Sequence, residues 1–202
     1  MAASKIQIWN MALGFIGTRT VASETEHTPE AIQCGLFWDS ARRQVLRDYP
    51  YNFAQARKTL AAVKVPDVYA EEWRFAYKLP DLCLKAHRIY GRERREVRRI
   101  PFTIVSSDDG TEILLTDMEA ARLDYTWDVT DVARWDDLFI AMMARKLAAL
   151  IGVPLLKNNS TKVQELEQLY RTSLPKAMES NASERHDREP LDTWLLSRGG
   201  CV

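Results

Sequence analysis

The sequence predicts an α+β fold: a four-helix bundle, made of two N-terminal and two C-terminal helices, with an inserted small antiparallel β region. Apolar residues recur at helical spacing near both ends of the chain, whereas the middle alternates at strand spacing. The stretch after residue 182 is polar and shows neither pattern. We therefore expect residues 1–182 to form one domain and residues 183–202 a flexible C-terminal arm. The expected elements are helices at about 4–17, 28–48, 131–151 and 160–180 and a β region at about 57–128.

The second predicted helix has the clearest boundaries. Thr28 is a suitable N-cap, and Pro29 then occupies the first helical position, where a missing N–H costs nothing. Pro50 ends the helix because it disfavours helical dihedrals at the residue before it. Tyr51 and Phe53 follow directly, and we expect this aromatic hook to lock the bundle to the β region. The outer face of the helix is predicted to carry three basic residues: Arg42, Arg43 and Arg47.

The other three helices are predicted from their periodicity and their end signals. The first ends at Gly17, which supplies a left-handed C-cap. The third is rich in good helix formers and is expected to end at Gly152, with Pro154 in the following loop. Ser160 is predicted to cap the fourth helix. Pro175 is expected to kink or break that helix, because proline inside a helix removes a hydrogen bond.

The β region is predicted to consist of short strands separated by turn residues. Residues 73–79 alternate between apolar and polar side chains, and residues 107–110 have the chemistry of a hairpin turn. We expect an antiparallel sheet whose strands pair with their neighbours in sequence. The predicted strands are 59–65, 73–79, 83–90, 97–105, 112–116 and 121–127.

Composition indicates an ordinary folded protein. The 28 basic and 28 acidic residues cancel, so the overall charge does not indicate a nucleic-acid binder. The three cysteines fit neither a disulfide framework nor a metal spacing, and we interpret them as reduced thiols in a cytosolic setting. No signal peptide is recognised, and no apolar run is expected to reach the roughly 18 residues of a membrane span. No membrane partner is therefore expected.

Residues with catalytic or metal-binding chemistry are scarce. The histidines at positions 27, 87 and 186 lack metal-ligand spacing, and the sequence contains no phosphate loop, nucleophile elbow or dinucleotide fingerprint. Cys34 lies on an apolar helix stripe and is interpreted as a buried thiol. We expect no catalytic residue, no metal site and no cofactor.

Two charged clusters remain. The basic cluster comprises Arg92, Arg94, Arg95, Arg98 and Arg99. A solvated edge strand and a protein interface explain it equally well, and a DNA phosphate backbone is the third interpretation. The acidic cluster comprises Asp128, Asp131, Asp136 and Asp137. Its position around the start of the third helix complements the helix macrodipole, which we prefer to general acid–base chemistry.

Five motifs then appear in one order along the chain. They are N-x-A-L-x-x-I-G at 10–17, A-R-x-x-V-L-R-x-x-P-(W/Y)-N-F-A at 41–54, (F/Y)-A-Y-x-L-P-x-x-C-L at 75–84, I-L-L-T-D at 113–117 and Y-x-x-x-V-T-D-x-x-x-W-D-x-L-F at 125–139. From residue 5 to about residue 180 the chain resembles the tail tubular protein A family, the head-to-tail adaptors of short-tailed bacteriophages and related prophages. Tyr51 stands where the family usually has tryptophan, and Pro175 with the tail after it is less typical.

The resemblance implies a structural virion protein and not an enzyme. Such adaptors form a ring, typically of about twelve copies, below the portal, where they extend the DNA channel and attach the tail nozzle. The expected partners are further copies of this chain, the portal protein and the nozzle protein, with non-specific proximity to channel DNA. The expected locations are the head-to-tail interface of the virion and, during assembly, the host cytoplasm. The alternative function is a helical DNA-binding or regulatory protein-interaction module of prophage origin.

The ring hypothesis gives the charged clusters and the arm candidate roles, because neighbouring subunits in a ring must present unlike, complementary faces. We expect the basic cluster, above all Arg98 and Arg99, to meet acidic residues of the next subunit. The candidate acidic residues are Asp108, Asp109, Asp136 and Asp137. The arm is expected to dock on the portal or an adjacent subunit, with packing on its own core as the alternative. Its docking residues are Trp194, Leu195 and Leu196. The helical arginines at 42, 43 and 47 are expected to line either a subunit contact or the DNA channel.

Overall fold

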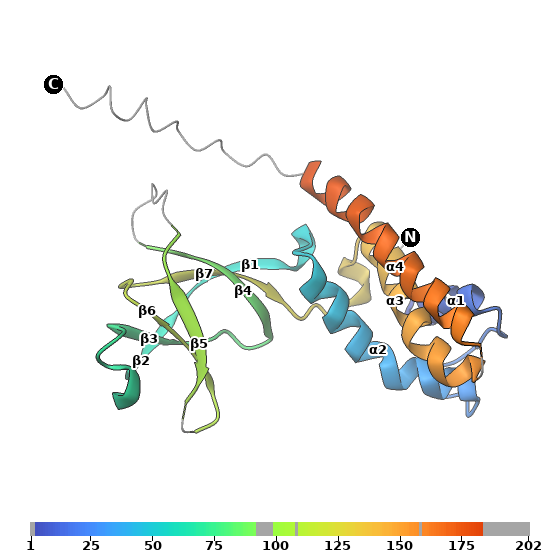
Figure 1. Cartoon of the computed structure of the whole chain (residues 1–202), viewed down its shortest axis with the longest axis horizontal. Coiled ribbons are helices and arrows are strands. Elements are labelled where there is room, and N and C mark those ends of the chain that lie inside the picture. The colour runs from blue at the N-terminus through green and yellow to red at the C-terminus, as the bar shows by residue number, and fades with distance from the viewer. Residues whose placement is uncertain (1–2, 92–98, 108, 158, 184–202) are drawn as a thin grey trace.

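Helices and strands occupy opposite ends of an elongated molecule in the computed structural model (Figure 1). The structure describes residues 3–91, 99–107, 109–157 and 159–183. Within these residues, two segments far apart in sequence, 3–54 and 128–183, form the helical lobe, and residues 55–127 form the β lobe. The helices are α1 (Lys5–Ile16), α2 (Pro29–Asp48), α3 (Asp137–Leu156) and α4 (Ser160–Ser183), with 3-10 turns η1 (Asn52–Ala54) and η3 (Val132–Arg134).

The ends of α1 and the start of α2 follow the local signals in the sequence. Ser4 and Gln7 form a capping box at the start of α1, and Gly17 ends this helix in the left-handed conformation with φ of +85°. The side chain of Thr28 accepts a hydrogen bond from the first turn of α2, where Pro29 is the first helical residue. The predictions for these caps are confirmed.

Two prolines that were predicted to interrupt or follow helices lie inside them. Pro154 is within α3, and Pro175 is within α4, which continues as one helix to residue 183. Gly152 does not cap α3. A Cβ atom at this position would lie 3.0 Å from Cδ1 of Leu166 on α4, so the glycine allows the two helices to approach closely. The predicted end of the third helix at 151 is wrong, because packing between α3 and α4 overrides local propensity and α3 continues to Leu156. The fourth helix ends near its predicted position, at residue 183.

The β lobe consists of two antiparallel sheets. Sheet A has the strand order β1-β7-β4, and sheet B has the order β2-β3-β6-β5. Its strands are β1 (Gln55–Thr59), β2 (Ala61–Val63), β3 (Phe75–Lys78), β4 (Cys83–Tyr90), β5 (Phe102–Ser106), β6 (Glu112–Thr116) and β7 (Arg122–Trp127), with a 3-10 turn η2 (Asp67–Tyr69) after β2. Strands next to each other in sequence pair in two cases, β2 with β3 and β5 with β6, whereas β1, β4 and β6 pair with distant strands.

The predicted four-helix bundle with a small β region is therefore wrong, because the part of the chain that the structure describes forms two sheets, of three and four strands. The predicted strand at 59–65 is wrong: it spans the last residue of β1, which pairs with β7 in sheet A, and all of β2, which pairs with β3 in sheet B. Leu60 lies between them, is buried, and donates its N–H to the carbonyl oxygen of Ala121 at 3.0 Å. Local alternation cannot separate these strands, because their partners lie far away in sequence.

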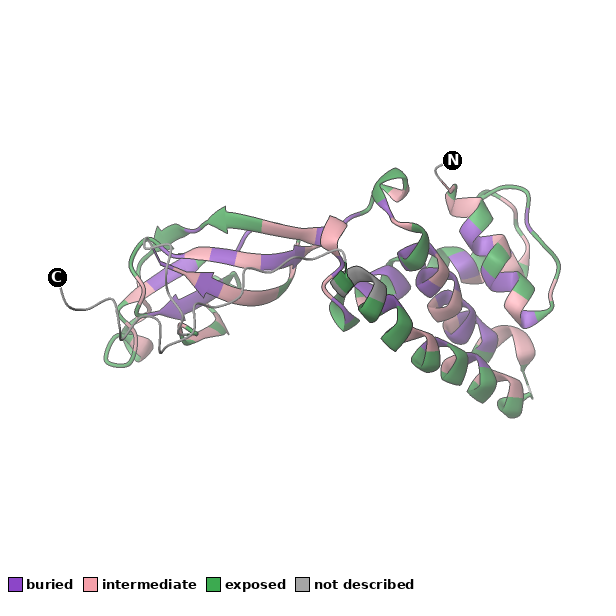
Figure 2. Cartoon of the chain, turned by 90° about the horizontal axis from the view of Figure 1, so that it is seen from above, coloured by how far each residue is buried: buried purple, intermediate pink, exposed green. Residues whose placement is uncertain are grey.

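Each lobe has its own buried core (Figure 2). In the helical lobe, α3 packs against α1, α2 and α4 and supplies much of the buried surface. In the β lobe, sheets A and B pack face to face through side chains that include Leu123 of sheet A and Leu114 of sheet B. Trp127, at the end of β7, contacts both cores. The lobes are thus joined where β7 leads back into the helical lobe.

By length and composition alone, α3 could cross a membrane, and within the described residues it is the one helix of this kind. The expectation that no apolar run is long enough is therefore wrong. A buried core helix passes the same test, and 56% of the apolar window of α3 is buried inside the molecule. Most of its apolar side chains are buried against the other three helices, whereas Val153 is exposed.

Candidate functional site

The two lobes meet at a buried ion pair between α2 and the end of β7. Arg42 on α2 is 3% exposed, and Asp128, directly after β7, is 2% exposed. Nε of Arg42 donates to Oδ1 of Asp128 at 2.7 Å, and the second terminal nitrogen of Arg42 donates to Oδ2 at 3.0 Å. Arg43 adds a bond from Nε to Oδ2 at 2.9 Å, and Arg42 also donates to Asp39. This bidentate pair fastens the first residue after β7 to α2, at the point where the chain leaves the β lobe.

The surroundings keep both partners of this pair charged. Burial by itself would raise the pKa of Asp128, but the hydrogen bonds from Arg42 and Arg43 outweigh burial and hold this pKa below its ordinary value. Burial likewise disfavours the charged form of Arg42, and the hydrogen bonds to Asp128 reverse that effect, so its pKa is raised. The prediction that Arg42 lies on the outer face is wrong, because the side chain is buried on Asp128. Asp128 in turn serves this ion pair and not the macrodipole of α3.

Aromatic side chains connect α2, the hook after it and α3. The ring of Trp38 stacks on Trp135 with 5.6 Å between centroids, and Trp135 lies edge-on to Phe139 at 4.8 Å. Tyr51 and Phe53 of the hook both pack on Phe139, at 4.9 and 5.1 Å. Aromatic pairs of this geometry contribute about 0.5–1.5 kcal/mol each beyond their buried area. The hook therefore anchors the chain in the helical core immediately before β1 begins.

Polar residues of the sequence motifs also stabilise the fold, through hydrogen bonds to the backbone. Asn10 exchanges two hydrogen bonds with the backbone of Val21, at 2.9 and 2.8 Å, and so holds the loop after α1. Asp131 and Asp136 cap η3 and α3 by accepting hydrogen bonds from backbone N–H groups at 3.0 and 2.6 Å. Asp117 accepts a hydrogen bond from the backbone of residue 74 at 3.1 Å. The capping role of Asp136 agrees with the macrodipole interpretation of this residue.

The other predicted interface residues fall into two groups. Those that are exposed within the described residues are Arg43, Arg47, Arg99, Asp109 and Asp137. Asp109 lies in the predicted hairpin between β5 and β6, where hydrogen bonds from the hydroxyl and the N–H of Thr111 lower the pKa of its carboxyl group. Residues outside the described ranges are Arg92, Arg94, Arg95, Arg98, Asp108, Trp194, Leu195 and Leu196.

A row of cationic side chains runs from the end of α2 along sheet A. Nζ of Lys85, at the start of β4, donates to the carbonyl oxygen of Arg47 at 2.9 Å and so joins this strand to the exposed end of α2. Farther along the sheet, the guanidinium groups of Arg57 and Arg88 lie 4.1 and 5.1 Å from the ring centroid of Tyr90. We call this row the cationic stripe; its members are Arg43, Arg47, Arg57, Lys85, Arg88 and Arg122.

Strand register explains why the sheet residues of the stripe share one face. In β7, Leu123 and Tyr125 are buried between the sheets, so residues 122, 124 and 126 face away from sheet B. Positions 57 and 88 both lie opposite Asp124. An irregularity between residues 86 and 88 turns His87 outward as well, where its ring meets the hydroxyl of Thr126 at 2.7 Å. The outer face of sheet A is therefore rich in cations.

Sequence reasoning missed most of this stripe because its members come from four separate segments. A weak signal does exist in the strand sequences themselves. Strands β1, β4 and β7 contain five lysines and arginines but a single acidic residue, Asp124. Arg57 donates to both oxygens of that carboxylate.

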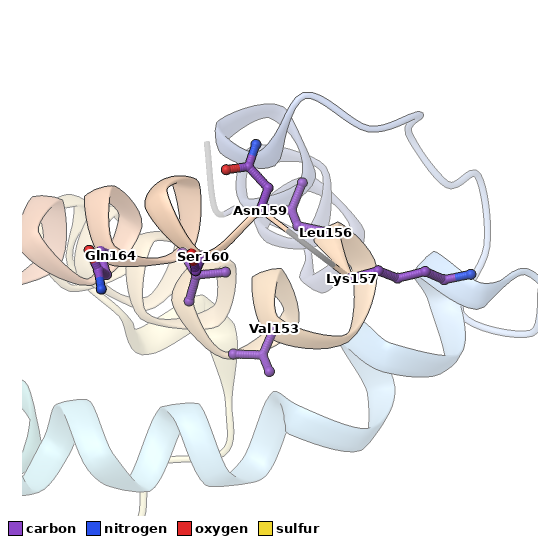
Figure 3. A pocket seen from close by; sticks show the side chains of 7 residues that line it. Val153, Leu156, Lys157, Asn159, Ser160 and Gln164 are labelled. Carbon is purple, nitrogen blue, oxygen red and sulfur yellow. The ribbon is translucent and has the colours of Figure 1, made fainter.

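The hollows on the surface of the described residues are shallow. One, of about 340 Å³, lies at the corner between α3 and α4, and its side chains point in different directions instead of converging on a common centre (Figure 3). Another lies beside the start of α2, next to Ile32 and Leu36. Within the described residues, no group of three or more histidine, cysteine or acidic side chains is placed to hold a metal ion.

A scan of protein-family profiles finds no match to this chain, and a search of curated proteins finds no significant match either.

Proposed function

We propose that this chain is a structural virion protein: a head-to-tail adaptor that forms a ring below the portal and attaches the tail nozzle. The observation that carries the proposal is the ordered series of five motifs, which resembles the tail tubular protein A family. Residues at these motif positions, including Arg42, Tyr51, Trp135 and Phe139, hold together the part of the helical lobe that borders the β lobe. The motifs therefore describe the architecture of a subunit and not the site of a reaction.

The surface of the subunit suits assembly into a ring. A ring is built from heterologous contacts, so one subunit must present two chemically different surfaces. Ile32 and Leu36 on α2 and Val153 on α3 are 54%, 68% and 61% exposed, which supplies apolar contact area on the helical lobe. Among the acidic candidates, Asp136 is engaged as a helix cap, so we assign the acidic side of the contact to Asp109 and Asp137.

Binding to the portal protein encoded in the same genome tests this proposal. When the full chain is mixed with purified portal and separated by size-exclusion chromatography with light scattering, we expect one complex that contains several adaptors per portal ring. A chain that elutes separately from the portal at all ratios contradicts the proposal.

Deletion of residues 190–202 tests the proposed role of the arm. We expect the truncated chain to unfold at the same urea concentration as the full chain and to lose portal binding, because Trp194, Leu195 and Leu196 are removed. Portal binding at the affinity of the full chain refutes docking through the arm.

A further inference from the structure

We propose that the cationic stripe binds the phosphate backbone of duplex DNA without sequence preference. The inference deepens the proposed function and rests on it for the identity of the DNA, which is the duplex that passes through the channel of the ring. It assigns the exposed arginines of α2, Arg43 and Arg47, to the channel and not to a subunit contact.

The outer face of sheet A is rich in cations, whereas the connections of sheet B are rich in acids. A polyanion is therefore expected to bind the face of sheet A. Asp124 is the single acid in the strands of sheet A, and Arg57 holds it in a bidentate pair. The side of sheet B carries the exposed cations Lys64, Arg74 and Lys78, but its connections also carry exposed acidic residues that offset them. The acidic residues are Glu71, Glu72, Asp117 and Glu119. A polyanion is therefore attracted more strongly to the outer face of sheet A than to the side of sheet B.

The side chains of the stripe are suited to phosphate groups. Five of its six members are arginines, and a planar guanidinium group can donate to two phosphate oxygens at once. Two of the five, Arg57 and Arg43, already donate to Asp124 and Asp128. Tyr90 holds the guanidinium groups of Arg57 and Arg88 against its ring, and Arg122 donates to the carbonyl oxygen of Gly91. Because these contacts restrict the arginines before any ligand arrives, less conformational entropy is lost on binding.

The shape and composition of the stripe favour DNA over a protein partner. The stripe is long and crosses from the helical lobe to the β lobe, which suits a duplex that carries about one negative charge per 1.7 Å of its axis. Protein interfaces are usually centred on buried apolar or aromatic anchors. Most of the large exposed apolar residues lie away from the stripe; they include Ile32, Leu36, Val68 and Val153 on the first half of α2, on η2 and on α3. Leu82, in the turn before β4, is exposed beside the α2 end of the stripe.

The dependence of DNA affinity on salt concentration tests the inference with the free full-length chain and a short blunt-ended duplex. Each phosphate contact contributes about 0.9 to the slope of log Kobs against log salt. Arg43 and Arg57 are already held by Asp128 and Asp124, so the other four members of the stripe give a slope of about −3.6. We expect a slope near this value and equal affinity for duplexes of unrelated sequence. Salt-independent affinity, or a strong preference for one sequence, overturns the inference.

A pair of matched triple variants locates the contact. Replacing Arg47, Lys85 and Arg88 with glutamine removes three cations of the stripe, and we expect the slope to become shallower by about 2.7. Replacing Lys64, Arg74 and Lys78 with glutamine removes three exposed cations on the side of sheet B, and we expect the slope of the parent chain. Circular dichroism melts of both variants verify that they are folded. Equal changes of slope in the two variants overturn the assignment of the contact to the stripe.

Portal binding measured on the same variants separates this inference from the proposed function. We expect the stripe variant to bind portal as the parent chain does. If it instead loses assembly and keeps the parent DNA slope, the stripe is a contact between copies of the chain and the inference is wrong. If the parent chain shows the expected DNA slope but no portal binding, the proposed function fails and DNA binding by the stripe stands.

Discussion

The helical lobe and the β lobe use their surfaces differently. In the helical lobe, α3 is enclosed by three other helices, and aromatic rings and a buried ion pair complete the core. In the β lobe, sheet B is packed on both faces, whereas sheet A buries one face and turns a charged face outward. An antiparallel sheet tolerates water on one face because its backbone groups are paired within the sheet. The comparison indicates that the helical lobe and its junction provide stability, and that sheet A is available for binding.

The largest expected loss of stability comes from breaking the buried ion pair between Arg42 and Asp128. Replacing Arg42 with alanine leaves Asp128 buried without its main partner, which we expect to lower the free energy of unfolding by about 3–5 kcal/mol. Urea denaturation measures this loss. Arg43→Ala is the matched control, because the Arg43 side chain is 58% exposed and its pair is screened by solvent, so the expected loss is below about 1 kcal/mol. Similar losses in the two variants would show that burial of the pair is not what stabilises the junction.

The pH dependence of stability tests whether Asp128 stabilises the fold in its ionised form. Its pKa is lowered in the folded state, so its ionised form stabilises the fold fully above the unfolded-state pKa of about 3.9, and this stabilisation disappears as pH falls through the lower folded-state pKa. Asp128→Asn lacks this titrating group. Urea denaturation across a pH series should therefore show a constant stability gap between the two proteins at neutral pH and a narrowing gap below about pH 4. A gap that stays constant into acid contradicts the ionised pair.

Two glycines test how tightly the helical core is packed, with a smaller expected effect. At Gly152 an added methyl group meets Leu166 at 3.0 Å, so we expect Gly152→Ala to lower stability by about 1 kcal/mol despite its better helix propensity. At Gly14 on α1 an added methyl group has no atom within 4 Å, so Gly14→Ala should raise stability by about 0.5–1 kcal/mol. Thermal melts of both variants measure the difference. Equal stabilisation by both substitutions contradicts the close approach of α3 and α4.

Local signals in the sequence were sufficient where the structure depends on neighbouring residues. The cap at Thr28, the left-handed end at Gly17 and the hairpin before residue 111 each depend on a few adjacent residues, and the structure confirms all three. Strand pairing could not be predicted in the same way, because β7 pairs with strands that lie far from it in sequence. The two-sheet arrangement follows from those distant pairings.

The candidate site was also hard to predict, because its contacts join residues that lie far apart in the sequence. Arg42 was assigned to the outer face by its charge, although it lies four residues after Trp38 and four before Leu46, both of which are buried. Its spacing indicated a buried side chain, but the partner, Asp128, is 86 positions away in the sequence. The cationic stripe was missed for the same reason, since Arg47 and Lys85 become neighbours only when β4 packs beside the end of α2.

Imaging the full chain bound to its portal tests the central claim most directly. The adaptor account predicts that negative-stain electron micrographs of the mixture show an additional ring of density on one side of each portal, with the rotational symmetry of a closed assembly of this chain. Portals that keep their original outline in the presence of excess chain would contradict the account.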